Sequence, residues 1–171
     1  FLEAFLNQTP ALPAVGRSRV REAQYQIVLS RQFGDQAAVL ARQLSFGSRD
    51  QLLSALGSVR GAGRPGIPIL RDFITHPDPL VRETAIDTLL VSGGEPAVAM
   101  IAPLLAKEPD VNVIHGVIRR LKDIKCAGSK ETVAGFLTHP DEDLVVSSIQ
   151  ASLSLAGEDN MVFGIDTPKK A

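Results

Sequence analysis

A repeat of 32 residues is the feature that most limits what this chain can fold into. In its second half, apolar residues line up at this spacing in five columns over three successive units. The columns are Ile69, Ile101 and Val133; Phe73, Leu105 and Leu137; Val81, Val113 and Val145; Ala85, Val117 and Ile149; and Leu89, Leu121 and Leu153. Such a period indicates stacked units that together bury a core no single unit could bury alone.

Each unit reads as two helices. Val81, Ala85 and Leu89 step by four positions, which is the spacing of one face of an amphipathic helix. Between the two helices of a unit a proline is followed by an aspartate, at residues 77–78, 109–110 and 140–141. Proline cannot continue the first helix, and aspartate can cap the second by accepting a backbone N–H bond.

The tripeptide His-Pro-Asp occurs twice in these turns, with His76 and His139 as its first residue. The middle unit has Glu108 at this position, and no cysteine or second histidine lies at the spacing of a metal site. We therefore expect a helix stop and start signal, with no metal site, no catalytic residue and no cofactor.

Over residues 1–60 the 32-residue repeat is less regular. Residues 35–59 still predict a helix pair, with Ser48 as the N-cap of its second helix. Residues 20–29 predict the second helix of an earlier unit, whose first helix is the short segment 1–7.

The clear units resemble the HEAT-repeat superfamily, in particular the short HEAT-like repeats of phycobilisome-lyase-like proteins. The matching string is "HPDPLVRETAIDTLL" followed by "GGEPAVAMIAPLL". Two features depart from the pattern: the period is shorter than the roughly 40–47 residues of classical units, and the arginine after valine occurs only as Arg82, with Ile114 and Val146 in the other units. The resemblance implies an armadillo-like superhelix and says little about function, because such arrays serve unrelated roles.

We accordingly predict an all-α fold, a right-handed α-solenoid of about four to five HEAT-like helix pairs. One repeat domain spans residues 1–156, with clear repeats over 66–156 and degenerate ones over 1–60. The tail, residues 157–171, has lost the period and is expected to be loosely ordered. Neither end is strongly capped, so self-association or packing on the rest of a longer chain is a further expectation.

Charge and composition limit the function classes. The net charge is −1, so the whole chain is no counterion for nucleic acid. Residues 1–72 carry nine arginines and five acids, or +4, whereas residues 73–171 carry nine basic and fourteen acidic residues, or −5. No apolar run predicts a membrane span. The single cysteine, Cys126, cannot form an internal disulfide, which favours the cytoplasm.

The second helices of a solenoid line one face, which is its usual binding surface. With Val81, Ala85 and Leu89 toward the core, positions 83, 84 and 87 point outward, and so do their equivalents 115, 116 and 119, and 147, 148 and 151. From this face we select five candidate binding residues for a protein or peptide: Glu83, Asp87, His115, Arg119 and Arg120. Alternatively, Asp87–Arg119 and Glu83–His115 are surface pairs worth about 0–1 kcal/mol each.

Other functions are less favoured. No motif of nucleophilic, nucleotide-binding or metalloprotease chemistry is present, and His115 and Cys126 lie roughly 16 Å apart along one helix, too far for a catalytic dyad. A bilin lyase-like or other small-ligand role is implied by the resemblance alone. Nucleic-acid binding would use the arginines of the first half: Arg17, Arg19, Arg21, Arg31, Arg42, Arg49, Arg60, Arg64 and Arg71.

Overall fold

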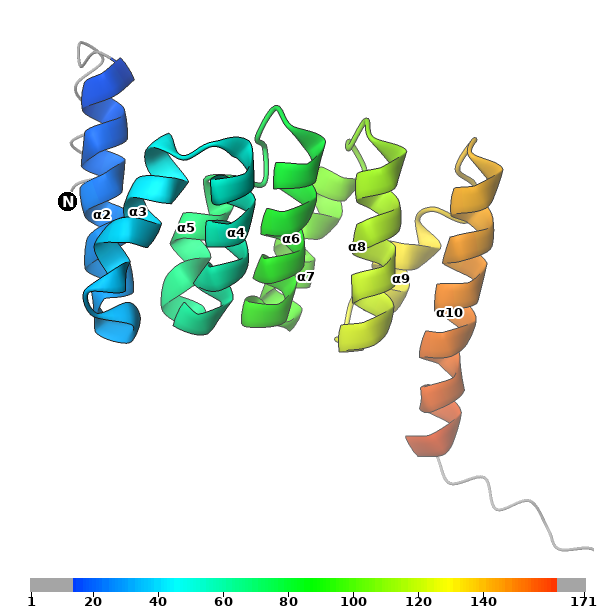
Figure 1. Cartoon of the computed structure of the whole chain (residues 1–171). Coiled ribbons are helices and arrows are strands. Elements are labelled where there is room, and N and C mark those ends of the chain that lie inside the picture. The colour runs from blue at the N-terminus through cyan, green and yellow to red at the C-terminus, as the bar shows by residue number, and fades with distance from the viewer. Residues whose placement is uncertain (1–13, 163–171) are drawn as a thin grey trace, which may run out of the picture.

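The computed structural model describes residues 14–162, and every regular element within them is a helix (Figure 1). In chain order the α-helices are α2 (Ala14–Phe33), α3 (Gln36–Phe46), α4 (Arg49–Val59), α5 (Ile67–Arg71), α6 (Pro79–Gly93), α7 (Glu95–Leu105), α8 (Val111–Ile124), α9 (Ser129–Ala134) and α10 (Glu142–Val162). Two short 3-10 helices, η1 (Arg60–Ala62) and η2 (Arg64–Gly66), lie between α4 and α5.

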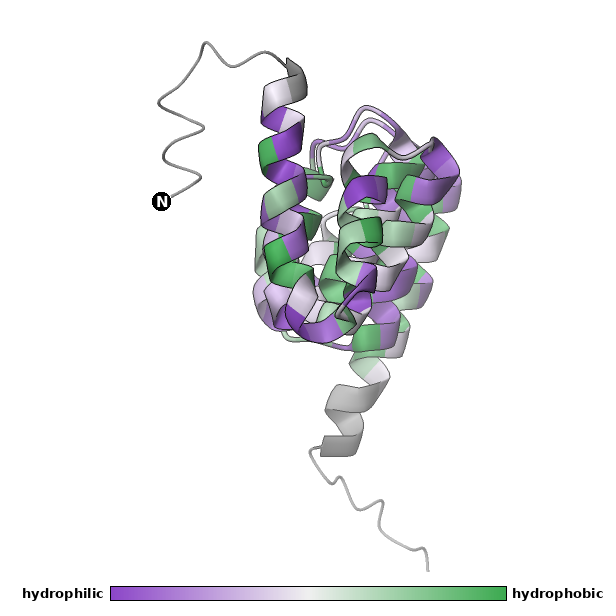
Figure 2. Ribbon diagram, turned by 60° about the vertical axis from the view of Figure 1, so that its left-hand side comes forward, coloured by the Kyte–Doolittle hydropathy of each residue, from purple (hydrophilic) through white to green (hydrophobic). Residues whose placement is uncertain are grey.

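The helices form two layers (Figure 1). In one layer α6 packs against both α4 and α8, and α8 also packs against α10. The shorter helices α5, α7 and α9 lie behind them, and α2 and α3 pack together at the N-terminal end. Each of the pairs α5–α6, α7–α8 and α9–α10 is thus one unit of the sequence repeat. Figure 2 shows hydrophobic residues gathered between the helices and hydrophilic ones toward the outside.

The predicted caps are present. Ser48 and Gln51 form a capping box at the start of α4, and Pro79 occupies the first turn of α6. The aspartate of each turn accepts a hydrogen bond from the first turn of the next helix, at 2.9 Å in each case: Asp78 from Leu80, Asp110 from Asn112, and Asp141 from Leu144. These bonds satisfy backbone donors that a helix start would otherwise leave unpaired.

The residue before each proline has a structural role. Its side chain accepts a hydrogen bond from the backbone N–H of the capping aspartate two positions on. The acceptors are Nδ1 of His76 (3.2 Å), Oε1 of Glu108 (3.0 Å) and Nδ1 of His139 (3.1 Å). Glutamate can therefore replace histidine here because the turn needs only an acceptor. Each histidine ring also lies about 6 Å from the phenylalanine three residues earlier, Phe73 or Phe136.

The predicted core columns are confirmed in the first two units. Val81, Ala85 and Leu89 of α6 are buried, as are Val113, Val117 and Leu121 of α8. Ile69, Ile101 and Val133 of the second layer are buried as well. The spacing of apolar residues in the sequence therefore predicted the buried face of these helices correctly.

In the last unit four of the five columns are wrong by one residue, and only Val133 is buried as expected. Ile149 and Leu153 are 45% and 68% exposed, and Leu137 is exposed, whereas Phe136, Leu144 and Ser148 are buried. The cause is visible in the sequence, because Pro140 follows Pro109 by 31 residues, not 32. The turn sets the register of the helix that follows it, so α10 buries positions one residue earlier.

The outward-facing positions expected on α10 are wrong for the same reason. Ser148 and Ala151 were expected on the outer face, and both are buried. Gln150 is exposed in place of Ala151. Counting from the turn, the positions equivalent to Glu83 and Asp87 are Val146 and Gln150.

Two ion pairs connect successive units near the turns. Arg49 of α4 pairs with the capping Asp78 at 2.5 Å. Arg82 of α6 binds both carboxylate oxygens of Glu108 and donates to the carbonyls of His76 and Pro77. Arg82, which follows Val81, thus stabilises both the turn before α6 and the turn before α8.

At the two ends, the expectations are tested only in part. The segment 1–7 lies outside the described residues, and so do residues 163–171. The helix predicted over 20–29 is longer than expected, since α2 runs from Ala14 to Phe33. Helix α10 continues beyond residue 157 to Val162.

Candidate functional site

The five candidate residues lie on two neighbouring helices of the first layer. Glu83 and Asp87 are one turn apart on α6, so they share a face, and His115 and Arg119 are one turn apart on α8. Arg120 follows on the side of α8 that is turned toward α6, where it reaches Asp87. The packing of α6 against α8 therefore brings residues of two successive repeat units onto one surface.

Asp87 pairs with Arg120. Both Nε and Nη2 of Arg120 donate to the Asp87 carboxylate, with 3.2 Å between Nη2 and Oδ2, and this bond raises the pKa of the Arg120 guanidinium. The expected Asp87–Arg119 pair is not among the ion pairs of the described residues, and Arg119 is exposed whereas Arg120 is half-buried. Since about a third of each paired side chain is exposed, the pair contributes about 0–1 kcal/mol.

Glu83 lies against the backbone of Gly116. A methyl group on Gly116 would come within 2.1 Å of the Glu83 carboxylate oxygen Oε1, so the missing side chain makes the space that this carboxylate occupies. Burial raises the pKa of Glu83, the negative charge of Asp87 adds to the effect, and the positive charge of Arg119 opposes it. The expected Glu83–His115 pair is not among the ion pairs of the described residues.

Two adjacent grooves open on this surface. The first, of about 330 Å³, lies between α6 and α8, and we call it the acidic groove. Its lining is Leu80, Glu83, Thr84, Asp87, Gly116, Arg119, Arg120 and Asp123. Three carboxylates face two guanidiniums there, and one carboxylate, that of Asp87, is already paired with Arg120.

The second groove, of about 230 Å³, lies between α8 and α10, and we call it the basic groove. Its lining is His115, Ile118, Arg119, Lys122, Ser147, Gln150 and Ala151. It holds two cationic side chains and no carboxylate. Arg119 lines both grooves, so four of the five candidate residues meet in the first groove and His115 meets Arg119 in the second.

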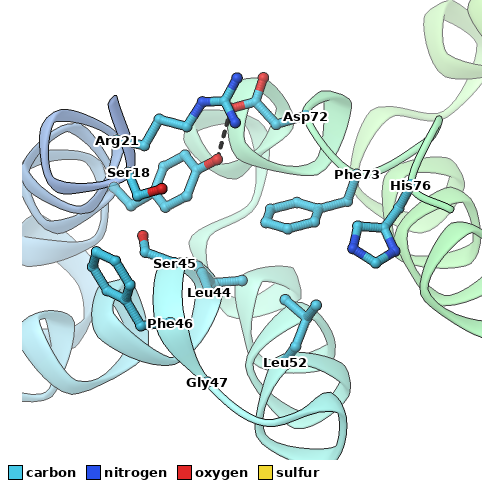
Figure 3. Close-up of a pocket in the computed structure, with 11 residues that line it drawn as sticks. Ser18, Arg21, Leu44, Ser45, Phe46, Gly47, Leu52, Asp72, Phe73 and His76 are labelled. Atoms are coloured by element: carbon cyan, nitrogen blue, oxygen red, sulfur yellow. Dashed lines mark hydrogen bonds between the residues drawn. The ribbon is translucent and has the colours of Figure 1, made fainter. Parts of the chain in front are cut away.

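A further cavity, which the sequence did not indicate, lies at the other end of the molecule (Figure 3). We call it the N-terminal pocket. It has a volume of about 310 Å³ and is lined by Ser18, Arg21, Tyr25, Leu44, Ser45, Phe46, Gly47, Leu52, Asp72, Phe73 and His76. Most of these residues come from units whose period is irregular, whereas Asp72, Phe73 and His76 come from the first clear unit, so no column linked the two groups.

Among residues 14–162 no cluster of three or more His, Cys, Asp or Glu side chains is placed to hold a metal ion. In the same part of the chain no helix has the length and apolar character needed to span a membrane.

Comparison of the chain with protein-family models, with curated proteins and with solved structures gives no match in any of the three. The surface chemistry of this chain is therefore the basis on which its function is inferred.

Proposed function

We propose that this chain is a non-catalytic protein-interaction module, a right-handed solenoid of HEAT-like helix pairs. Its binding surface is the outer face of α4, α6, α8 and α10. The repeated pairing of a longer helix with a shorter one behind it supports this architecture.

The position of Arg119 between two grooves of opposite charge is the observation that carries the proposal. In the acidic groove, the half-buried carboxylate of Glu83 is in none of the hydrogen bonds or ion pairs recorded for the described residues. Removing a carboxylate from water without a partner is unfavourable, so a cationic group that entered this groove would gain a charge-assisted hydrogen bond.

The basic groove favours the opposite charge. Arg119 and Lys122 face it from one helix, and the polar side chains of Ser147 and Gln150 face it from the next. We infer that the partner is a protein segment with a basic side chain for the acidic groove and a nearby acidic side chain for the basic groove. Complementary charges of this kind give specificity and speed association more than they raise affinity.

Small-ligand binding is the second candidate, and the N-terminal pocket supports it. Nucleic-acid binding by the first half is less favoured, because Arg49, one of its nine arginines, already pairs with Asp78.

A selection from a library of displayed random peptides tests the proposal. The wild-type chain should enrich peptides that combine a Lys or Arg with a nearby Asp or Glu, and Arg119→Glu should lose them. The matched control is Arg42→Glu, an equal charge reversal at an exposed position of α3. Two results would count against the proposed surface: selected peptides that bind Arg119→Glu as well as they bind Arg42→Glu, or selected peptides without this charge pattern.

A further inference from the structure

The N-terminal pocket has the size of a small-molecule site. Its volume of about 310 Å³ is at the lower end of the roughly 300–1,000 Å³ that such sites span. It lies between α2, the connection from α3 to α4, and the segment that follows α5, so three parts of the chain enclose it (Figure 3). It is separate from both grooves, and an inference about it does not depend on the proposed function.

Opposite charges stand at the rim of the pocket. Arg21 and Asp72 are both exposed, and the Asp72 carboxylate accepts a hydrogen bond of 2.7 Å from the Tyr25 hydroxyl. The described residues include no ion pair between Arg21 and Asp72. One cation and one anion thus remain available to a ligand.

Apolar side chains form one part of the pocket wall. Leu44 and Phe73 are buried, Leu52 is partly buried against the core, and the Phe46 ring is 49% exposed. In Figure 3 the rings of Phe46 and Phe73 lie on different sides of the space. An apolar group placed there would cover aromatic surface that is now partly in contact with water.

Ser45 adds a polar group to the lining of the pocket. Its hydroxyl is buried and has no hydrogen-bond partner, although buried polar groups are nearly always paired. Figure 3 shows this hydroxyl directed toward Ser18 of α2, on the same side of the pocket as Arg21.

We propose that the N-terminal pocket binds a free α-amino acid with an apolar side chain. Arg21 and Ser45 bind its carboxylate, Asp72 binds its ammonium group, and Phe46, Phe73 and Leu52 contact its side chain. A ligand with a single charge is attracted by one rim group and repelled by the other, whereas a zwitterion can place each of its charges beside the opposite one.

Calorimetric titration of the purified chain with L-leucine and L-phenylalanine tests this proposal. We expect one molecule of at least one of them to bind per chain. N-acetyl-L-phenylalanine lacks the ammonium charge and L-phenylalaninamide lacks the carboxylate, so each should bind at least tenfold more weakly than L-phenylalanine. L-aspartate and L-lysine should also bind more weakly, because each brings a second charge into the apolar part.

Three variants test the assigned residues. Arg21→Met and Asp72→Asn should each weaken binding at least tenfold, and the asparagine carbonyl can still accept the Tyr25 bond, which keeps the pocket intact. Ser45→Ala should weaken binding without lowering the melting temperature, since it removes an unpaired hydroxyl. The control is Arg31→Met, which removes an exposed arginine of the same helix outside the pocket.

The proposal is overturned if neither apolar amino acid binds up to its solubility limit. It is also overturned if the two capped derivatives bind as well as L-phenylalanine, which would indicate a site for an apolar group alone. Equal weakening by Arg31→Met and Arg21→Met would show that only the net charge matters.

Discussion

Arg82 and Glu108 form a bidentate ion pair that joins α6 to the turn before α8. The distances are 2.9 Å from Nε to Oε2 and 2.6 Å from Nη2 to Oε1. The two side chains are only 12% and 8% exposed. Because Glu108 also accepts the backbone N–H of Asp110, this pair connects a helix, a turn and the cap of the next helix.

Arg82→Ala should therefore be strongly destabilising. It leaves the Glu108 carboxylate and the carbonyls of His76 and Pro77 without their donors, and we expect a loss of about 3 kcal/mol in the free energy of unfolding. Arg120→Ala, which removes the exposed ion pair with Asp87, should cost no more than about 1 kcal/mol. Urea denaturation of both variants gives the comparison, and equal losses would contradict the role assigned to Arg82.

The acceptor before the proline can be tested at His76. His76→Ala removes the bond to the Asp78 N–H and should lower the free energy of unfolding by about 1 kcal/mol. His76→Glu should lower it less, because Glu108 makes the same bond in the next unit. A glutamate variant no more stable than the alanine variant would show that the histidine ring, and not its acceptor atom, holds the turn.

The raised pKa of Glu83 predicts that its contribution to the free energy of unfolding depends on pH. Its pKa in the folded protein is raised above 4.5, so its contribution to stability is present below the unfolded-state pKa and is lost as the pH rises through the folded-state pKa. Glu83→Gln should therefore increase the free energy of unfolding at neutral pH, by less than about 1 kcal/mol because the carboxylate is partly solvated. The increase should vanish in acid, where both states are protonated. An increase of equal size at both pH values would rule out this electrostatic cause.

Gly116→Ala tests whether the missing side chain makes the space for Glu83. Alanine favours a helix over glycine by up to about 1 kcal/mol, and the group that it displaces is the end of a flexible side chain. We expect a stability equal to or above that of the wild type, and a Glu83 pKa closer to its ordinary value, measured by NMR titration. A destabilised variant would mean that Glu83 cannot move aside.

Tyr25 can be followed directly, because it is the single tyrosine and the chain has no tryptophan. Burial and the bond to Asp72 raise its pKa well above 10.0. Stability from this group is present below that ordinary value and is lost as the pH rises toward the folded-state pKa. Ultraviolet absorbance should therefore show phenolate only when circular dichroism shows unfolding. Ionisation of the phenol in the folded chain would contradict its burial.

Much of the fold could be predicted from spacing alone. Proline and aspartate in each turn set the helix starts, and Val81, Ala85 and Leu89 set the buried face of α6. The error in α10 arose from a fixed period, because the turn at Pro140 comes one residue early. A period counted from each turn would have placed Leu144 and Ser148 correctly.

The sequence predicted which helix face carries the candidate residues, but not which of these residues contact one another. Outward positions on α6 and α8 follow from the helical repeat, and Glu83, Asp87, Arg119 and Arg120 do line one groove. That Asp87 pairs with Arg120 rather than Arg119 depends on how α8 is rotated against α6, which spacing does not contain. The N-terminal pocket lies where the irregular first units pack against the segment after α5, and a contact between unlike units leaves no periodic signal.

The most direct test of the proposed interaction surface is a charge exchange across it. A peptide selected on the wild-type chain is measured by calorimetry against wild type and Arg119→Glu, and then again with its acidic residue changed to arginine. We predict that Arg119→Glu weakens binding of the original peptide at least tenfold. The peptide with arginine in place of its acidic residue should bind the Arg119→Glu variant about as well as the original peptide binds the wild type. If the original peptide binds both proteins equally, or if the exchange restores nothing, the surface of α6, α8 and α10 is not the binding site.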